Sequence, residues 1–151
     1  MNLGRYVLLI LIVFSSTVLA KDWQALYSQN SEAFWRDWEV QIARASKCAA
    51  PDIMKRYLSA AAELGGNASV TERNAEIIES LAISQSKCLL AGLELLPSKS
   101  RGRVVFLFLL HPLYHEPNEI EDPLQRLWSK GLFPASRKAF LDAQAPATLP
   151  R

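Results

Sequence analysis

The spacing of apolar residues is the feature of this chain that most restricts its fold. From residue 31 onward these residues recur every three or four positions, as in Phe34, Trp38, Ile42 and Ala45. This period places them on one side of an α-helix, whereas a half-buried strand would alternate apolar and polar residues. The sequence therefore predicts an all-α fold, a single-domain bundle of about five to six helices.

Cap residues and helix breakers divide this pattern into separate helices. Ser31 is the expected N-cap of the first full helix, and a shorter helical stretch around residues 23–27 precedes it. Pro51 suits the first position of the next helix, because the N–H that proline lacks would have no partner there. Gly65 and Gly66 are expected to end that helix, since glycine readily adopts the left-handed cap conformation.

The segment that follows predicts the longest helix of the chain. Ser69 and Glu72 have the spacing of a capping box, in which two side chains satisfy free backbone N–H groups reciprocally. An apolar seam then continues to Pro97, which indicates a single helix of about 25 residues. Residues 98–103 are polar and indicate a connector.

Residues 104–110 are entirely apolar, so periodicity alone leaves both a buried helix and a buried strand open. A helix is favoured, because no second convincing strand is available to pair with this one. Two prolines indicate a loop over residues 111–122. Asp122 is the expected N-cap of a helix that Gly131 closes, and a last short helix is expected from Pro134.

The N-terminal residues have the order of regions found in secretion signals. In residues 1–20, Arg5 precedes an apolar run, and Ala20 provides a small residue at the expected cleavage position. A retained membrane anchor is the alternative, although the run is short for a span of about 20 apolar residues. Cleavage would leave a helical domain over residues 21–144 and a flexible tail over residues 145–151. We expect this product in the periplasm or secreted, without membrane contact.

Cys48 and Cys88 are the two cysteines of the chain. An even number in an exported protein favours a disulfide, and two free buried thiols are the alternative. Both residues continue the inward-facing registers of their helices. We therefore expect a bridge that closes a loop of about 40 residues and stabilises the fold by about 4 kcal/mol.

Charge and motifs exclude several classes of function. The formal net charge of +2 gives no sign of the basic patch that a nucleic-acid-binding protein needs. His111 and His115 share a helical spacing, but Pro112 separates them and no HExxH pattern is present. No nucleophile elbow or phosphate-binding loop occurs. The sequence predicts a protein that is not an enzyme and has no metal or cofactor, with a small hydrolase or metal-binding enzyme as the less favoured alternative.

The proline-containing loop is the candidate contact surface for a protein partner. An exposed aromatic residue beside several carboxylates suits recognition of a partner with a basic cleft. A plain connector is the alternative. The candidate partner-binding residues are Pro112, Tyr114, His115, Glu116, Asn118, Glu119 and Glu121.

The chain carries five features in a fixed order: Cys88–Pro97, a basic connector, an apolar segment, His111–His115 and Asn118–Ile120. In this layout residues 48–130 resemble the small periplasmic immunity proteins that neutralise type VI secretion amidase effectors. The resemblance implies an exported, all-helical and commonly dimeric protein that plugs the active site of a secreted peptidoglycan amidase with a loop. A pilotin-like periplasmic helper of an envelope machine is the alternative, against which the missing lipobox weighs mildly.

Overall fold

The computed structural model describes residues 21–145. The predicted leader, residues 1–20, and residues 146–151 of the predicted tail lie outside the described part. Within residues 21–145 the chain forms eight α-helices and one π-helix and no strand. The all-α prediction is confirmed, whereas the predicted five to six helices are too few. In chain order the helices are α1 (Trp23–Gln29), α2 (Ser31–Ser46), α3 (Pro51–Glu63), α4 (Ala68–Ser84), α5 (Ser86–Glu94), α6 (Ser98–Val104), η1 (Val105–Leu110), α7 (Pro117–Trp128) and α8 (Pro134–Gln144).

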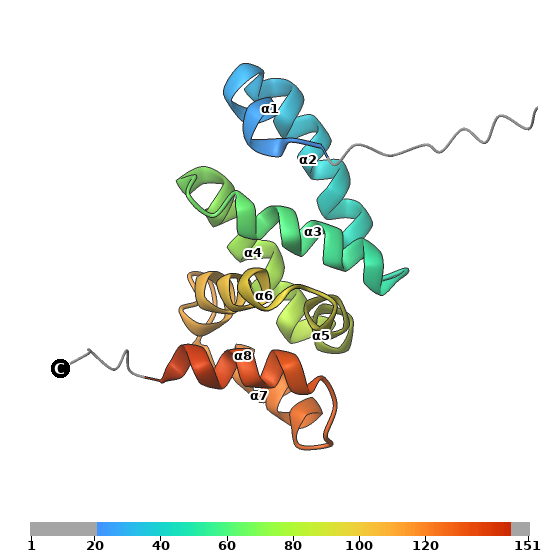
Figure 1. The fold of residues 1–151 in the computed structure, drawn as a ribbon, viewed down its shortest axis with the longest axis vertical. Helices are drawn as coiled ribbons and strands as arrows, with labels where there is room; N and C mark the ends of the chain where they lie inside the picture. Colours follow the sequence, from blue (N-terminus) through green and yellow to red (C-terminus); the bar gives the residue numbers. More distant parts are fainter. Residues whose placement is uncertain (1–20, 146–151) are drawn as a thin grey trace, which may run out of the picture.

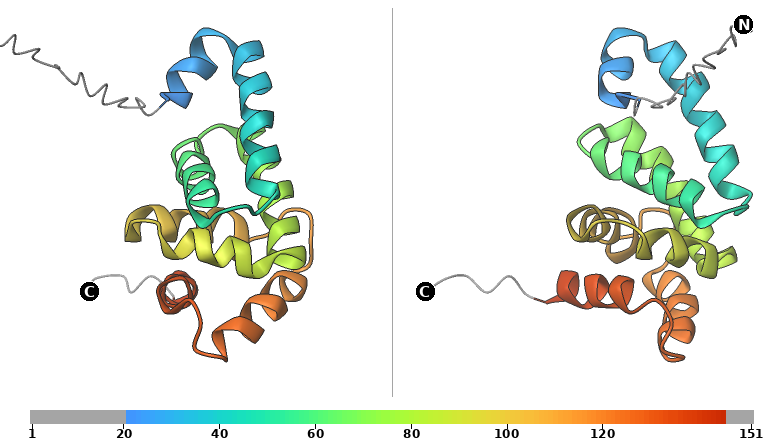
Figure 2. Two further views of the ribbon diagram at one scale, coloured as in Figure 1. Left: turned by 90° about the vertical axis from the view of Figure 1, so that its right-hand side faces the viewer. Right: turned by 45° about the vertical axis from the view of Figure 1, so that its right-hand side comes forward.

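The helices are stacked along the longest axis of the molecule (Figure 1). The pair α1 and α2 forms one end, the pair α7 and α8 forms the other, and the remaining helices lie between them. The helices point in several different directions in the two views of Figure 2. Helix α3 packs mainly on α5, and η1 packs on both α4 and α8.

A continuous apolar core runs through the stack. At the α1–α2 end the rings of Phe34 and Trp38 stack with their centroids 5.7 Å apart, and Trp23 meets Trp38 edge-on at 4.9 Å. At the opposite end the rings of Trp128 and Phe140 lie 5.2 Å apart. Large aromatic side chains thus close both ends of the core.

Two helices begin earlier than the sequence predicts, because asparagine side chains cap them. Oδ1 of Asn30 accepts a 2.9 Å hydrogen bond from the N–H of Ala33, so Asn30 and not Ser31 is the N-cap of α2. Oδ1 of Asn67 accepts a 3.2 Å bond from the N–H of Val70 at the start of α4. The predicted Ser69–Glu72 capping box is therefore wrong.

The predicted helix of about 25 residues is interrupted at Gln85. This residue has a φ of −141° and a ψ of 41°, and it separates α4 from α5. Its side chain donates a 3.2 Å hydrogen bond to the carbonyl of Ser46. The seam of apolar residues continues across the break because both helices pack on the same core, so periodicity conceals the interruption.

Residues 98–103 belong to α6 rather than to a connector, and the helix continues directly into η1. The chain keeps right-handed helical dihedrals at Val104 and Val105. Polar residues do not prevent a helix whose outer side meets solvent. The favoured helical interpretation of residues 104–110 is confirmed, although most of this segment forms the rarer π-helix.

Helix α7 begins at Pro117 and contains Pro123, so the predicted start at Asp122 is wrong. The backbone N–H of Glu116 donates a 3.0 Å hydrogen bond to Oε2 of Glu119, which stabilises an earlier start. Beyond the end of α7, Gly131 has a φ of +74°, in the region that glycine adopts most easily.

Helix α3 ends at Glu63, and the two glycines that follow it do not adopt a left-handed conformation. Gly65 instead lies where η1 approaches closely. A Cβ atom at this position would lie 2.5 Å from Cδ1 of Leu107 on η1. The predicted role of Gly65 as a left-handed cap is therefore wrong.

The predicted disulfide is confirmed. Cys48 and Cys88 are bonded, with an S–S distance of 2.01 Å and a Cα–Cα distance of 5.8 Å. The bridge joins the turn after α2 to the first turn of α5. Both cysteines are half-buried and pack against the apolar core from its edge.

Candidate contact loop

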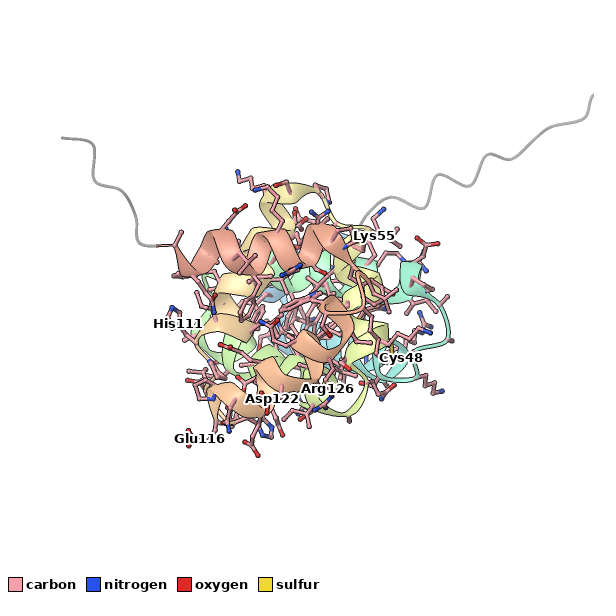
Figure 3. All side chains as sticks on the ribbon, turned by 90° about the horizontal axis from the view of Figure 1, so that it is seen from below. Cys48, Lys55, His111, Glu116, Asp122 and Arg126 are labelled. Atoms are coloured by element: carbon pink, nitrogen blue, oxygen red, sulfur yellow. A yellow bond between two sulfur atoms is a disulfide. The ribbon has the colours of Figure 1, made fainter. Side chains whose placement is uncertain are left out.

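The loop that joins η1 to α7 is shorter than predicted. It comprises residues His111–Glu116, hereafter the contact loop, because residues 117–122 already belong to α7. Figure 2 shows this link on the outside of the stack, close to α4. In Figure 3 His111 and Glu116 lie on one side of the molecule and Cys48 lies on the other.

A buried carboxylate on α4 holds the backbone of the contact loop. Oε1 of Glu79 accepts a 2.7 Å hydrogen bond from the N–H of Leu113. Oε2 of Glu79 accepts from the N–H groups of Tyr114 and His115, at 2.9 and 3.1 Å. Glu79 itself is 0% exposed. Bonds to a charged acceptor are about twice as strong as neutral ones, so they fix the conformation of the loop.

The same part of the loop exposes large apolar side chains. Leu113 is 60% exposed and Tyr114 is 53% exposed. On η1, Phe106 is 53% exposed, and its ring meets the ring of His111 edge-on at a centroid distance of 5.5 Å. The loop and its neighbour on η1 therefore form an exposed apolar surface on a fixed backbone.

The predicted partner-binding residues lie along the contact loop and the first turns of α7. Tyr114, Glu116, Asn118 and Glu119 are exposed, whereas Pro112, His115 and Glu121 are half-buried. Nδ1 of His115 lies 3.7 Å from Oε2 of Glu119, which also accepts the N–H of Glu116. Glu119 thus contributes to the start of α7 in addition to the charge of the surface.

Sequence reasoning missed Glu79, Leu113 and Phe106. A signal for Glu79 was available: it lies four residues after Ala75 and three before Ala82, on the buried side of α4. A carboxylate at a position reserved for apolar residues indicates a specific partner inside the fold. Phe106 gave no signal, because its uniformly apolar neighbours hide which side faces solvent.

A second carboxylate binds backbone N–H groups in the same manner, elsewhere in the molecule. The two oxygens of Glu94 on α5 accept hydrogen bonds of 3.0 Å each from Ala135 and Ser136. These N–H groups belong to the first turn of α8, which otherwise lacks a side-chain cap. Glu94 therefore provides a natural comparison for Glu79.

The described part of the chain shows neither a metal-binding cluster nor a membrane-spanning helix. Between residues 21 and 145, no three His, Cys, Asp or Glu side chains are grouped so that they could bind a metal ion. The helices described there include none with the length and apolar character that crossing a membrane requires. The structure does not bring His111 and His115 together with further ligands.

No protein-family model matches the chain, and no significant match is found among curated proteins or solved structures. A functional proposal therefore depends on the geometry of the contact loop.

Proposed function

We propose that this chain is an exported inhibitor that neutralises a secreted peptidoglycan amidase by covering the active site of that enzyme. The contact loop and the first turns of α7 form the inhibitory surface. The observation that carries the proposal is the set of three hydrogen bonds by which Glu79 holds an exposed loop in one conformation.

A fixed loop supports an inhibitory function for an entropic reason. Ordering the backbone of one residue costs about 1–2 kcal/mol, and this cost reduces affinity if it arises on binding. In this protein the bonds to Glu79 order the loop before any partner arrives. Exposed Tyr114 then offers a residue type that often dominates interfaces, and exposed Leu113 adds apolar area beside it.

The charges beside the contact loop support a partner with a basic surface. Glu116 and Asp122 are exposed, and none of the ion pairs among the described residues involves either of them. Such carboxylates accelerate association with a positively charged partner and contribute less to the final affinity.

The expected location is compatible with this function. An amidase that cuts peptidoglycan acts outside the cytoplasm, where the predicted leader would deliver the chain. The Cys48–Cys88 bridge is of the kind that persists in oxidising compartments. The homodimer that the family resemblance implies stays a prediction.

The decisive experiment uses residues 21–151 together with a secreted peptidoglycan amidase encoded beside the gene for this chain, and the lack of any such neighbouring gene would count against the proposal. Hydrolysis of purified peptidoglycan should stop when the two proteins are present in equal amounts. Tyr114→Ala should restore hydrolysis, whereas Val40→Ala should not, because Val40 is a 45% exposed apolar residue on α2, at the other end of the stack. Undiminished hydrolysis with the wild-type protein in excess would refute the inhibitor and favour the alternative of an envelope-assembly helper.

A further inference from the structure

Glu79 and the contact loop depend on each other. A buried carboxylate costs several kcal/mol unless its oxygens are bound. Among the described residues no lysine, arginine or histidine forms an ion pair with Glu79, and its acceptors are used by loop N–H groups alone. The loop cannot leave this conformation without stranding the carboxylate in the core.

Three consecutive backbone N–H groups of the loop depend on Glu79. Within residues 21–145, the N–H groups of Leu113, Tyr114 and His115 have no acceptor other than Glu79. The side chains of Leu113 and Tyr114 are more than half exposed. Pro112 and His115 are half-buried, and His115 also lies 3.7 Å from Glu119. Glu79 is therefore the restraint that acts directly on the backbone N–H groups of residues 113–115.

We propose that Glu79 is the positioning residue of an interaction surface whose centre is Leu113 and Tyr114. Phe106 on η1 meets the His111 ring at the start of the loop, and Glu116 is an exposed carboxylate at its end. The occupant is a protein pocket that is apolar at its floor and basic at its rim. The identity of this partner as an amidase rests on the proposed function, whereas the hold of Glu79 on the loop does not.

The restraint by Glu79 predicts how much affinity is lost when the loop becomes mobile. If only a fraction of the molecules holds the loop in the competent conformation, the apparent dissociation constant rises by the inverse of that fraction. Loss of the Glu79 carboxylate should reduce that fraction to about one tenth and should raise the dissociation constant about tenfold. The loss should come mainly from slower association, since the contacts in the complex are unchanged.

The test compares Glu79→Gln with the matched variant Glu94→Gln. Each replaces a carboxylate that binds backbone N–H groups, but Glu94 binds those of α8. In Glu79→Gln an NH2 donor replaces one of the two acceptor oxygens, so at least one loop N–H loses its acceptor. Amide hydrogen exchange at one or more of residues 113–115 should accelerate about tenfold or more, and affinity for the amidase should fall about tenfold. In Glu94→Gln, exchange should accelerate at Ala135 and Ser136 and affinity should stay unchanged.

A third variant, Tyr114→Ala, distinguishes loss of a contact side chain from loss of loop order. It also provides a test if Glu79→Gln does not fold. Tyr114→Ala should weaken binding about tenfold and leave amide exchange at Leu113 and His115 as in the wild type. Unaltered exchange in folded Glu79→Gln would refute the positioning role without any partner. If Glu79→Gln exchanges faster but binds the amidase as tightly as the wild type, the link between loop order and binding is refuted. Equal losses of affinity in Glu79→Gln and Glu94→Gln would refute it as well. If the wild-type protein does not bind the amidase, the proposed function fails together with the role of Leu113 and Tyr114 in binding it. Amide exchange in Glu79→Gln still tests whether Glu79 restrains the loop.

Discussion

The hydroxyl of Tyr57 donates a 3.0 Å hydrogen bond to Oδ1 of Asn74, and both side chains are buried. The indole N–H of Trp38 donates to the same oxygen at 3.2 Å. One amide oxygen therefore joins α2, α3 and α4 inside the core.

Burial raises the pKa of Tyr57 well above its usual range. The folded protein keeps the phenolic proton, whereas the unfolded chain releases it above about pH 10. The contribution of protonated Tyr57 to the free energy of unfolding is therefore complete below about pH 10 and decreases as the pH rises further. Tyr57→Phe should cost about 0.5–1.5 kcal/mol at neutral pH and make the alkaline loss shallower. Urea unfolding between pH 7 and pH 11 measures both effects, and parallel curves for the two proteins would contradict the prediction.

Close packing of α3 on α5 predicts a strong effect of a small substitution. A Cβ atom at Gly92 would overlap with Cγ of Met54, and it would lie 2.7 Å from Cβ of the same residue. Gly92→Ala should destabilise the protein by about 1–3 kcal/mol, because Cβ of Met54 can move only with its backbone. Gly102→Ala is the control: no atom lies within 4 Å of the new Cβ, and alanine favours the helix by about 1 kcal/mol. Thermal unfolding should thus shift in opposite directions for the two variants.

Removal of the disulfide should lower stability without changing the fold. Cys48 and Cys88 are 40 positions apart, and a closed loop of that length contributes about 4 kcal/mol in the chain-entropy model. The double variant Cys48→Ala/Cys88→Ala should melt several degrees lower under oxidising conditions. Reductant should lower the melting temperature of the wild type and leave the variant unaffected. Equal melting temperatures of the two oxidised proteins would show that the bridge contributes little.

The acidic side chains near the contact loop should govern the rate of association with the partner. Replacement of Glu116 and Glu121 by lysine reverses two charges. Replacement of Glu119 by glutamine removes a third charge and preserves an acceptor for the N–H of Glu116. Association at low salt should slow several-fold, with little change in dissociation. Glu63→Lys, at an exposed site on α3, is the control. Stopped-flow kinetics at two salt concentrations test this, and an unchanged association rate would exclude steering by these carboxylates.

Local patterns predicted the helices better than their ends. The 3.6-residue period revealed the helical segments of α2, α3 and α4, since each buries one face in the same core. The ends depend on which of two adjacent polar residues caps the helix, and Asn30 prevails over Ser31 through a geometry that the sequence does not specify. The break at Gln85 escapes detection because it preserves the apolar seam.

The candidate site was predictable only in part. Prolines and polar residues located the contact loop, because they disfavour regular structure within a few positions. The residue that holds the loop is 34 positions from Leu113, and only the packing of α4 brings the two together. The disulfide also joins residues far apart in the sequence, but it could be predicted. Cys48 and Cys88 are the sole cysteines of the chain and leave one possible pairing.

The dependence of the loop on a helix far away in sequence has a consequence for protein engineering. Specificity cannot be transplanted by grafting residues 111–116 alone onto another helical scaffold, because the recipient lacks an acceptor for three consecutive N–H groups. A functional chimera must carry Glu79 along with the graft, at a matching depth and orientation. Diversification of this surface is accordingly easiest at Leu113 and Tyr114, where side chains can vary while the main-chain scaffold stays constant.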